Sequence, residues 1–323
     1  MQACEVGYPM REEFLSSPDV SEFVSWLSAH VASLPVRLEL PHSPYVPAGL
    51  VAETHFAAIV PRHYRWRLAG MSTGDWYETT QCVHALALPL RDAVVRNDAA
   101  AARRACEAIA QWGADRNSRV GASAFLNGLK DSLPGYLKHA RMALRLSVME
   151  PNGDYGALLR MNSTLCKIHA LLARDGLPIY ESRVAVAAAT LVELWRRDTG
   201  RAQQPLPAAL CFPAVGSQAH RRIRHVFPDA ADPGVLGYVQ GSESATAARW
   251  ADAAVRLGVI IEATLQQCDP RLFVSSASSP TGAMSGRKAA FIGALFMAGY
   301  EPACLRPGDV RVRQQELAAH DGR

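Results

Sequence analysis

Glu181 is the residue of this sequence whose surroundings best suit chemistry. It follows the loop Asp175-Gly176-Leu177-Pro178, which cannot continue a helix, and stands at or just before the first turn of the next expected helix. The N–H groups and the dipole of a helix start favour a negative charge. A carboxylate fixed there can stabilise positive charge on a sugar, or orient and deprotonate water. The alternative is an ordinary helix-terminal acid, worth roughly 0.3 to 1 kcal/mol.

The elements that must position this carboxylate lie within residues 154–198. The sequence predicts two helices joined by a tight turn, then the loop, then a third helix. Leu165, Ile168 and Leu172 share one face of the second helix, whereas Lys167 projects from the opposite face. This order predicts a site as well as a core.

The segment 179–184, IYESRV, resembles the Pro-Val-Asp-Thr-His-Val segment around the catalytic aspartate of the helix-hairpin-helix (HhH-GPD) DNA glycosylases. In this match Glu181 takes the place of the aspartate, Ser182 that of the threonine and Arg183 that of the histidine. Ser163 stands close to where bifunctional members carry a lysine after a glycine-rich hairpin. Neither that lysine nor those glycines are present.

The resemblance implies a monofunctional DNA glycosylase that hydrolyses the bond between base and sugar with water. Without the family's lysine, no amine stands in the usual position to form a Schiff base. Lys167, one helical turn further on, is the candidate substitute, and a solvated or DNA-facing lysine is the other interpretation. The catalytic candidates are therefore Glu181 and Lys167.

The expected partner is double-stranded DNA with a modified base, which would be flipped out of the helix and excised to leave an abasic site. Departures from housekeeping members also give a likeness to bacterial antiviral glycosylases that act on a hypermodified phage base, such as a glucosylated hydroxymethylcytosine. No residue specifies the base. The resemblance implies no cofactor, and we expect a monomer.

Contacts to DNA are expected from two places. Backbone N–H groups around residues 161–164 would point at a phosphate, because a helix N-terminus favours anions. The run AHRRIRHVF at 219–227 is the densest positive cluster, although a solvated helix face explains it equally well. The candidate DNA-binding side chains are Arg160, Asn162, Ser163, Arg183, Arg221 and Arg222.

The expected walls of a base pocket are Tyr180, Trp76, Trp112 and Asp115, and Asp115 is alternatively a helix cap. In residues 61–81, basic Arg62, Arg65 and Arg67 alternate with aromatic residues. Such a surface can neutralise phosphates and stack on bases. The other interpretation is a loop that its aromatic residues anchor to the helical body.

Two other classes of function remain open. One is a helical DNA-binding or scaffold protein that has kept the hairpin and lost the chemistry. The other is an enzyme on small molecules that uses Asp115 and Glu181 as a carboxylate pair. His169, on the apolar face of its helix, is expected to be a core residue. Zinc-protease, nucleophile-elbow, dinucleotide and P-loop motifs do not occur.

Composition fits a globular protein: 49% of the 323 residues are hydrophobic and the net charge is +4. The seven cysteines are scattered without a CxxC pair, which disfavours a disulfide framework and an iron–sulfur cluster. No apolar stretch is long enough to span a membrane, and the N-terminus lacks a signal-peptide pattern. A cytoplasmic protein is expected.

The predicted fold is mainly α, an HhH-GPD-like arrangement with a cleft between two helical subdomains and little β structure. The N-terminal segment 1–80 is expected to hold short strands and the aromatic and basic loop. A helical core with the hairpin covers 81–205, and a helical region that completes the cleft covers 206–323. Periodicity predicts helices over 11–34, 82–97, 99–112, 118–131, 134–149, 243–268 and 286–299.

Overall fold

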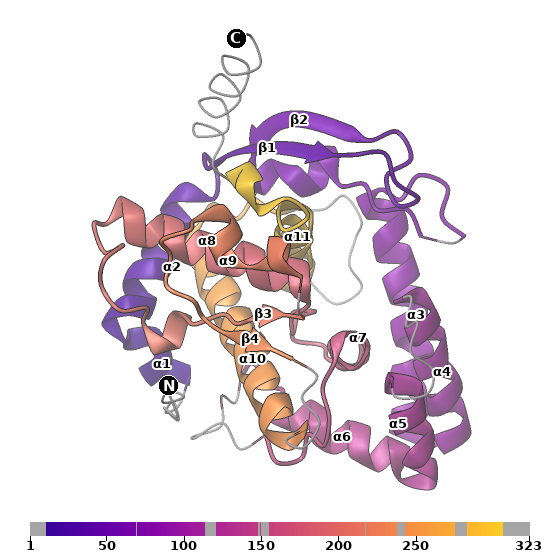
Figure 1. Ribbon diagram of the computed structural model, residues 1–323. Coiled ribbons are helices and arrows are strands. Elements are labelled where there is room, and N and C mark those ends of the chain that lie inside the picture. Colours follow the sequence, from indigo (N-terminus) through magenta and orange to yellow (C-terminus); the bar gives the residue numbers. More distant parts are fainter. Residues whose placement is uncertain are drawn as a thin grey trace.

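The computed structural model is built mainly from helices, which confirms the predicted fold class (Figure 1). It describes residues 11–68, 70–113, 121–147, 149, 155–216, 218–237, 243–274 and 283–305. Within these residues the α-helices are α1 Arg11–Ser16, α2 Pro18–His30, α3 Trp76–Arg96, α4 Ala99–Trp112, α5 Ala122–Gly128, α6 Leu133–Ala143, α7 Ser163–Leu172, α8 Ser182–Asp198, α9 Ile223–Val226, α10 Glu243–Gln267 and α11 Ala283–Ala298.

One group of helices runs from α3 to α7. Helices α3 and α4 pack side by side, and α7 contacts α3, α4 and α6. The turn between α3 and α4 explains why α4 begins at Ala99 as predicted: Asn97 takes a left-handed conformation with φ 60°, and the Asp98 side chain caps the new helix by accepting from Ala101 N at 2.8 Å.

A second group consists of α2, α8, α10 and α11. Helix α8 packs against α11 and α2, and α10 packs against the same two helices. Trp195 of α8 and Trp250 of α10 are fully buried in this group. Figure 1 shows these helices together on one side, with α3 and α4 on the other. Helix α8, which lies in the predicted 81–205 core, therefore packs with helices from both ends of the chain.

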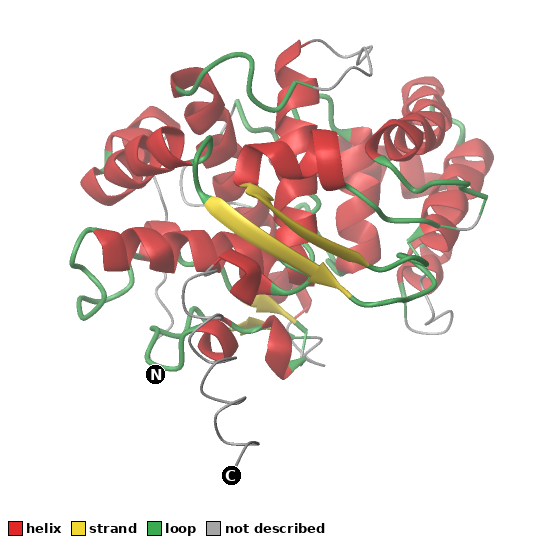
Figure 2. Cartoon of the chain, turned by 90° about the horizontal axis from the view of Figure 1, so that it is seen from above, coloured by secondary structure: helices red, strands yellow, loops and turns green. Residues whose placement is uncertain are grey.

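The β structure is small, as predicted. Strands β1 Pro35–Leu40 and β2 Leu50–His55 form an antiparallel pair that crosses above the helices in Figure 2. Alternate residues of β1 are buried because successive side chains in a strand point to opposite faces. Strands β3 Ala214–Val215 and β4 Val235–Leu236 form a short parallel pair.

The predicted hairpin is wrong in its first helix. Described residues 155–162 are turns and extended chain, and only α7 of the expected pair forms. Asn162 explains the start of α7, because its backbone is extended and its side chain accepts a hydrogen bond from Leu165 N at 2.8 Å. An N-cap of this kind begins a helix and does not continue one.

Other predicted helices differ mainly at their ends. The helix expected over 134–149 ends at Ala143, and the one expected over 11–34 is divided at Ser17 and ends at His30. Pro18 at the start of α2 accounts for the division, because proline lacks the N–H that a continuous helix needs.

Candidate functional site

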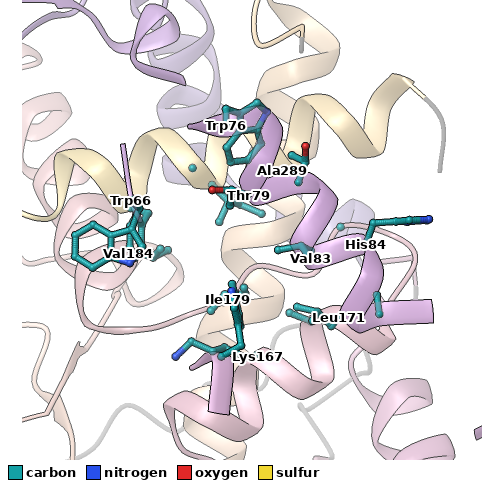
Figure 3. Close-up of a pocket in the computed structure, with 18 of the residues that line it drawn as sticks. Trp66, Trp76, Thr79, Val83, His84, Lys167, Leu171, Ile179, Val184 and Ala289 are labelled. Carbon is teal, nitrogen blue, oxygen red and sulfur yellow. The ribbon is translucent and has the colours of Figure 1, made fainter. Parts of the chain in front are cut away.

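A cavity of about 670 Å³ lies between the two groups of helices. Its wall comes from α3, the end of α4, α7, the start of α8, α11 and the extended segment 64–68. Figure 3 shows α3 contributing Trp76, Thr79 and Val83 to one side, with Lys167 and Leu171 of α7 below them. The aromatic residues of the wall are Tyr45, Tyr64, Trp66, Trp76, Trp112 and Phe296.

Glu181 lines this cavity and is the N-cap residue of α8. Its Oε1 accepts a hydrogen bond from Arg183 N at 3.0 Å. The carboxylate is thus fixed at the positive end of a helix and only partly buried. No ion pair to it is found within the described residues.

The loop before Glu181 explains which side chains reach the cavity. Residues 173–181 are without regular secondary structure, and Leu177, Ile179 and Glu181 line the cavity at every second position. An extended chain turns successive side chains to opposite sides. Gly176, with φ 85°, begins this run in a conformation that favours glycine.

Tyr180 is a correction to the expected pocket wall. It lies between two cavity residues, so its ring points the other way, where it is fully buried and its hydroxyl donates to Pro213 O at 2.7 Å. Its own carbonyl accepts from Trp250 Nε1 at 2.8 Å. Tyr180 therefore anchors the loop to α10.

Lys167 lines the cavity from α7. A Cβ atom at Gly113 would lie 3.1 Å from its Cδ and 3.4 Å from its Nζ, so the absence of a side chain at Gly113 leaves room for the amine. Among the described residues Lys167 has neither a hydrogen bond nor an ion pair. As far as the described residues go, the cavity therefore holds an amine without an ion-pair partner as well as the Glu181 carboxylate.

Arg183 also lines the cavity, from the first turn of α8. Its guanidinium carbon lies 4.2 Å from the ring centre of Trp66 and 4.7 Å from that of Phe296. These distances suit cation–π attraction, which is strongest where water is excluded. Its Nε is buried and has no hydrogen-bond partner in the described part of the chain.

Trp76 and Trp112 line the cavity, and both indole N–H groups are buried without a partner in the described residues. Unpaired buried donors are rare, because each one costs free energy. Asp115 lies outside the described residues.

The residues expected to bind phosphate lie elsewhere. Asn162 is buried and its side chain caps α7, Ser163 is half-buried at the helix start, and Arg160 is half-buried in the preceding chain. None of the three lines the cavity.

Arg221 is a second correction, because it is buried and its guanidinium donates to the carbonyls of Gly299 and Tyr300. Burial lowers its pKa. Arg222 beside it is half-buried, and its Nε has no partner within the described residues. The positive cluster at 219–227 thus serves partly to hold the chain at the end of α11.

Arg287 and Lys288 in the first half of α11 are also buried. Lys288 Nζ donates to Asp175 O at 2.6 Å and to Glu262 Oε2 at 2.5 Å. These contacts tie α11 to the loop before Glu181 and to α10.

Tyr45, His84 and Phe296 also line the cavity, and nothing in the sequence indicated them. No local pattern marks them, since tertiary packing alone brings them to the wall. By contrast, the sequence does show the alternation of Tyr64 and Trp66 with arginines. The two aromatic residues of this pattern line the cavity.

The described residues hold no group of three or more His, Cys, Asp or Glu side chains that could bind a metal ion. Nor does any of their helices combine the length and apolar character needed to cross a membrane. Comparisons with protein-family models, with curated proteins and with solved structures give no match.

Proposed function

We propose that the protein is a monofunctional DNA N-glycosylase that takes an extruded, modified base into the cavity and hydrolyses its bond to deoxyribose. The observation that carries this proposal is the position of Glu181. Its carboxylate caps the start of α8 and lines a cavity large enough for a nucleotide. A convex or filled surface at this position would have removed the basis for it.

The walls of the cavity support a planar, polar occupant. Aromatic side chains offer stacking surfaces for a base that has left the helix. The indole N–H groups of Trp76 and Trp112, which have no acceptor within the described residues, could donate to bases and to their oxygen-containing substituents.

The size of the cavity supports a base with a bulky substituent. A volume of 670 Å³ falls within the roughly 300 to 1,000 Å³ of pockets that enclose drug-sized molecules. A lone nucleobase would leave much of it empty. A glucosylated hydroxymethylcytosine, as in hypermodified phage DNA, is the substrate of this class that we propose.

In the proposed reaction the bond between the base nitrogen and C1′ breaks, and the base leaves with the bonding electrons. The Glu181 carboxylate stabilises the positive charge that develops on the sugar. It then accepts a proton from the water molecule whose oxygen bonds to C1′. The products are the free base and an abasic site.

Lys167 is proposed as a cation beside the substrate and not as a nucleophile. An amine that attacked C1′ would form a Schiff base, which borohydride reduces to a stable protein–DNA adduct. Hydrolysis by water leaves no such adduct. Trapping with borohydride therefore separates the two mechanisms.

The deciding experiment incubates the protein with genomic DNAs, unmodified and hypermodified, and measures abasic sites by alkaline strand cleavage. We expect release of a base from modified DNA, and we expect Glu181→Gln to lower the rate by about 10² to 10⁴ while DNA binding remains. Glu107→Gln, an exposed glutamate on α4, is the matched control and should retain full activity.

Undiminished activity of Glu181→Gln would remove Glu181 from the mechanism. Salt-dependent DNA binding with no base released from any DNA would instead identify a non-catalytic DNA-binding protein.

A further inference from the structure

Segment 64–68 builds one wall of the cavity and exposes positive charge on its other side. Tyr64, Trp66 and Leu68 line the cavity, whereas Arg65 and Arg67 between them are exposed. This alternation follows from the extended backbone. Arg62, also exposed, precedes the segment.

The backbone that carries these arginines is held firmly. Trp66 N donates to Gly74 O at 2.6 Å, and Arg67 N donates to Tyr45 O at 2.7 Å. The rings of Tyr45 and Trp66 stack with their centres 4.5 Å apart. A surface on such a support loses little conformational freedom when it binds a partner.

The three arginines have no carboxylate partner among the described residues. Some other described arginines do have such partners, for example Arg197 with Glu193 and Arg201 with Asp19. Next to the three, the pKa of His63 is lowered by burial and by Arg62 and Arg65. Among the described residues, positive charge without a carboxylate partner therefore gathers on the outer face of this wall of the cavity.

Residues two apart on an extended chain are separated by about 7 Å. Arg65 and Arg67 thus stand at a separation similar to that of consecutive phosphates along one nucleic-acid strand. A nucleotide inside the cavity stays joined through its phosphates to the strand outside, so consecutive phosphates of that strand would pass the outer face of the wall.

The geometry points to Arg62, Arg65 and Arg67 as the surface that holds the phosphates beside the extruded nucleotide. This inference rests on the proposed function, because it takes the occupant of the cavity to be part of a DNA strand. It places phosphate contacts on the outer face of the cavity wall, in addition to those expected at residues 161–164 and 219–227.

The test measures binding of a fluorescent duplex oligonucleotide at a series of KCl concentrations. Each phosphate contact contributes about 0.9 to the slope of log affinity against log salt, so R62Q/R65Q/R67Q should lower the slope by about 2.7. The affinity lost between about 50 and 200 mM salt should then become roughly fortyfold smaller.

The matched control is R104Q/R145Q/R249Q, which removes three exposed arginines from other parts of the surface, none of them at the cavity. Its slope should equal that of the wild type. The inference would be overturned if R62Q/R65Q/R67Q had the same salt slope as the wild type, or if both triple variants lowered the slope equally. Binding to heparin with no binding to duplex DNA would overturn it as well.

The release of a base distinguishes this failure from failure of the proposed function. If the wild-type protein excises a base and R62Q/R65Q/R67Q has an unchanged salt slope, the glycosylase proposal stands and the inference about the arginines is wrong. If the variant lowers the salt slope but no base is excised from any DNA, the arginines bind phosphates and the glycosylase proposal is wrong.

Discussion

At the residue scale, Gly299 controls how closely the end of α11 approaches the start of α8. A Cβ atom there would lie 2.0 Å from the carbonyl oxygen of Arg183, two residues from Glu181. The only relief is a shift of backbone, since that oxygen belongs to the main chain.

We therefore expect Gly299→Ala to lower the free energy of unfolding by about 1 to 3 kcal/mol or more, through overpacking. Excision should fall as well, because the start of α8 must move. Urea unfolding and the abasic-site assay measure both effects. Gly135→Ala, where nothing lies within 4 Å of the added atom, is the control and should stabilise α6 by roughly 0.4 to 1 kcal/mol.

His169 gives a pH dependence at the same scale. Burial lowers its pKa to about 4, and neither ring nitrogen has a partner within the described residues. Between pH 6.5 and pH 4 the unfolded chain binds a proton that the folded chain does not, so stability falls as the pH falls through this window.

The His169 contribution amounts to about 3 kcal/mol over the full window. We expect His169→Leu to show a correspondingly smaller loss of stability between pH 7 and pH 4 than the wild type, measured by urea unfolding. His139→Leu, an exposed histidine on α6, should keep the wild-type dependence. Parallel curves for all three proteins would contradict the prediction.

At the element scale, the loop before α3 depends on one carboxylate. Glu78 accepts hydrogen bonds from the backbone N–H groups of Ser72, Thr73 and Gly74 at 2.6 to 2.8 Å. The bonds from Ser72 and Gly74 are the main causes that lower its pKa to about 2. This loop also receives the Trp66 N–H, so it supports the arginine-bearing segment.

We expect Glu78→Gln to loosen this loop, with faster amide exchange over 66–75 and faster proteolytic cleavage there at neutral pH. In the wild type the carboxylate keeps these bonds above pH 4.5 and loses them only as the pH falls toward 2. Glu107→Gln should show no change in exchange at these residues.

The elements themselves were largely predictable. Helix α4 begins and ends where the sequence indicated, since Asp98 caps it and Gly113 follows it. The helix expected before α7 did not form, because apolar residues such as Leu158 and Met161 are buried in irregular chain. Periodicity alone does not distinguish burial in a loop from burial in a helix.

At the scale of the whole molecule, the cavity depends on walls from two groups of helices. Ala289 of α11 is an exposed cavity residue, drawn near Trp76 and Thr79 of α3 in Figure 3. A large side chain at position 289 would occupy the cavity in place of a ligand and would not enter the hydrophobic core.

We therefore expect Ala289→Trp to abolish excision while thermal stability and the salt slope of DNA binding remain close to the wild type. Ala108→Trp, at an exposed position of α4 away from the cavity, should leave excision unchanged. Full activity of Ala289→Trp would show that the substrate binds outside this cavity.

The sequence indicated the centre of the site and two of its wall residues, Trp76 and Trp112, but not the rest of the walls. Glu181 and Lys167 were predictable because loop breakers and helical spacing mark them locally. Phe296, Tyr45 and the inner face of α11 were not, since their place depends on how distant segments pack.

The contribution of α11 bears on synthesis. A ribosome makes Glu181 before it makes residues 283–298, so a nascent or prematurely terminated chain without α11 lacks Ala289, Ile292 and Phe296 from the cavity wall. We therefore expect a fragment that ends before residue 283 to lack whatever binding or activity the complete cavity supports.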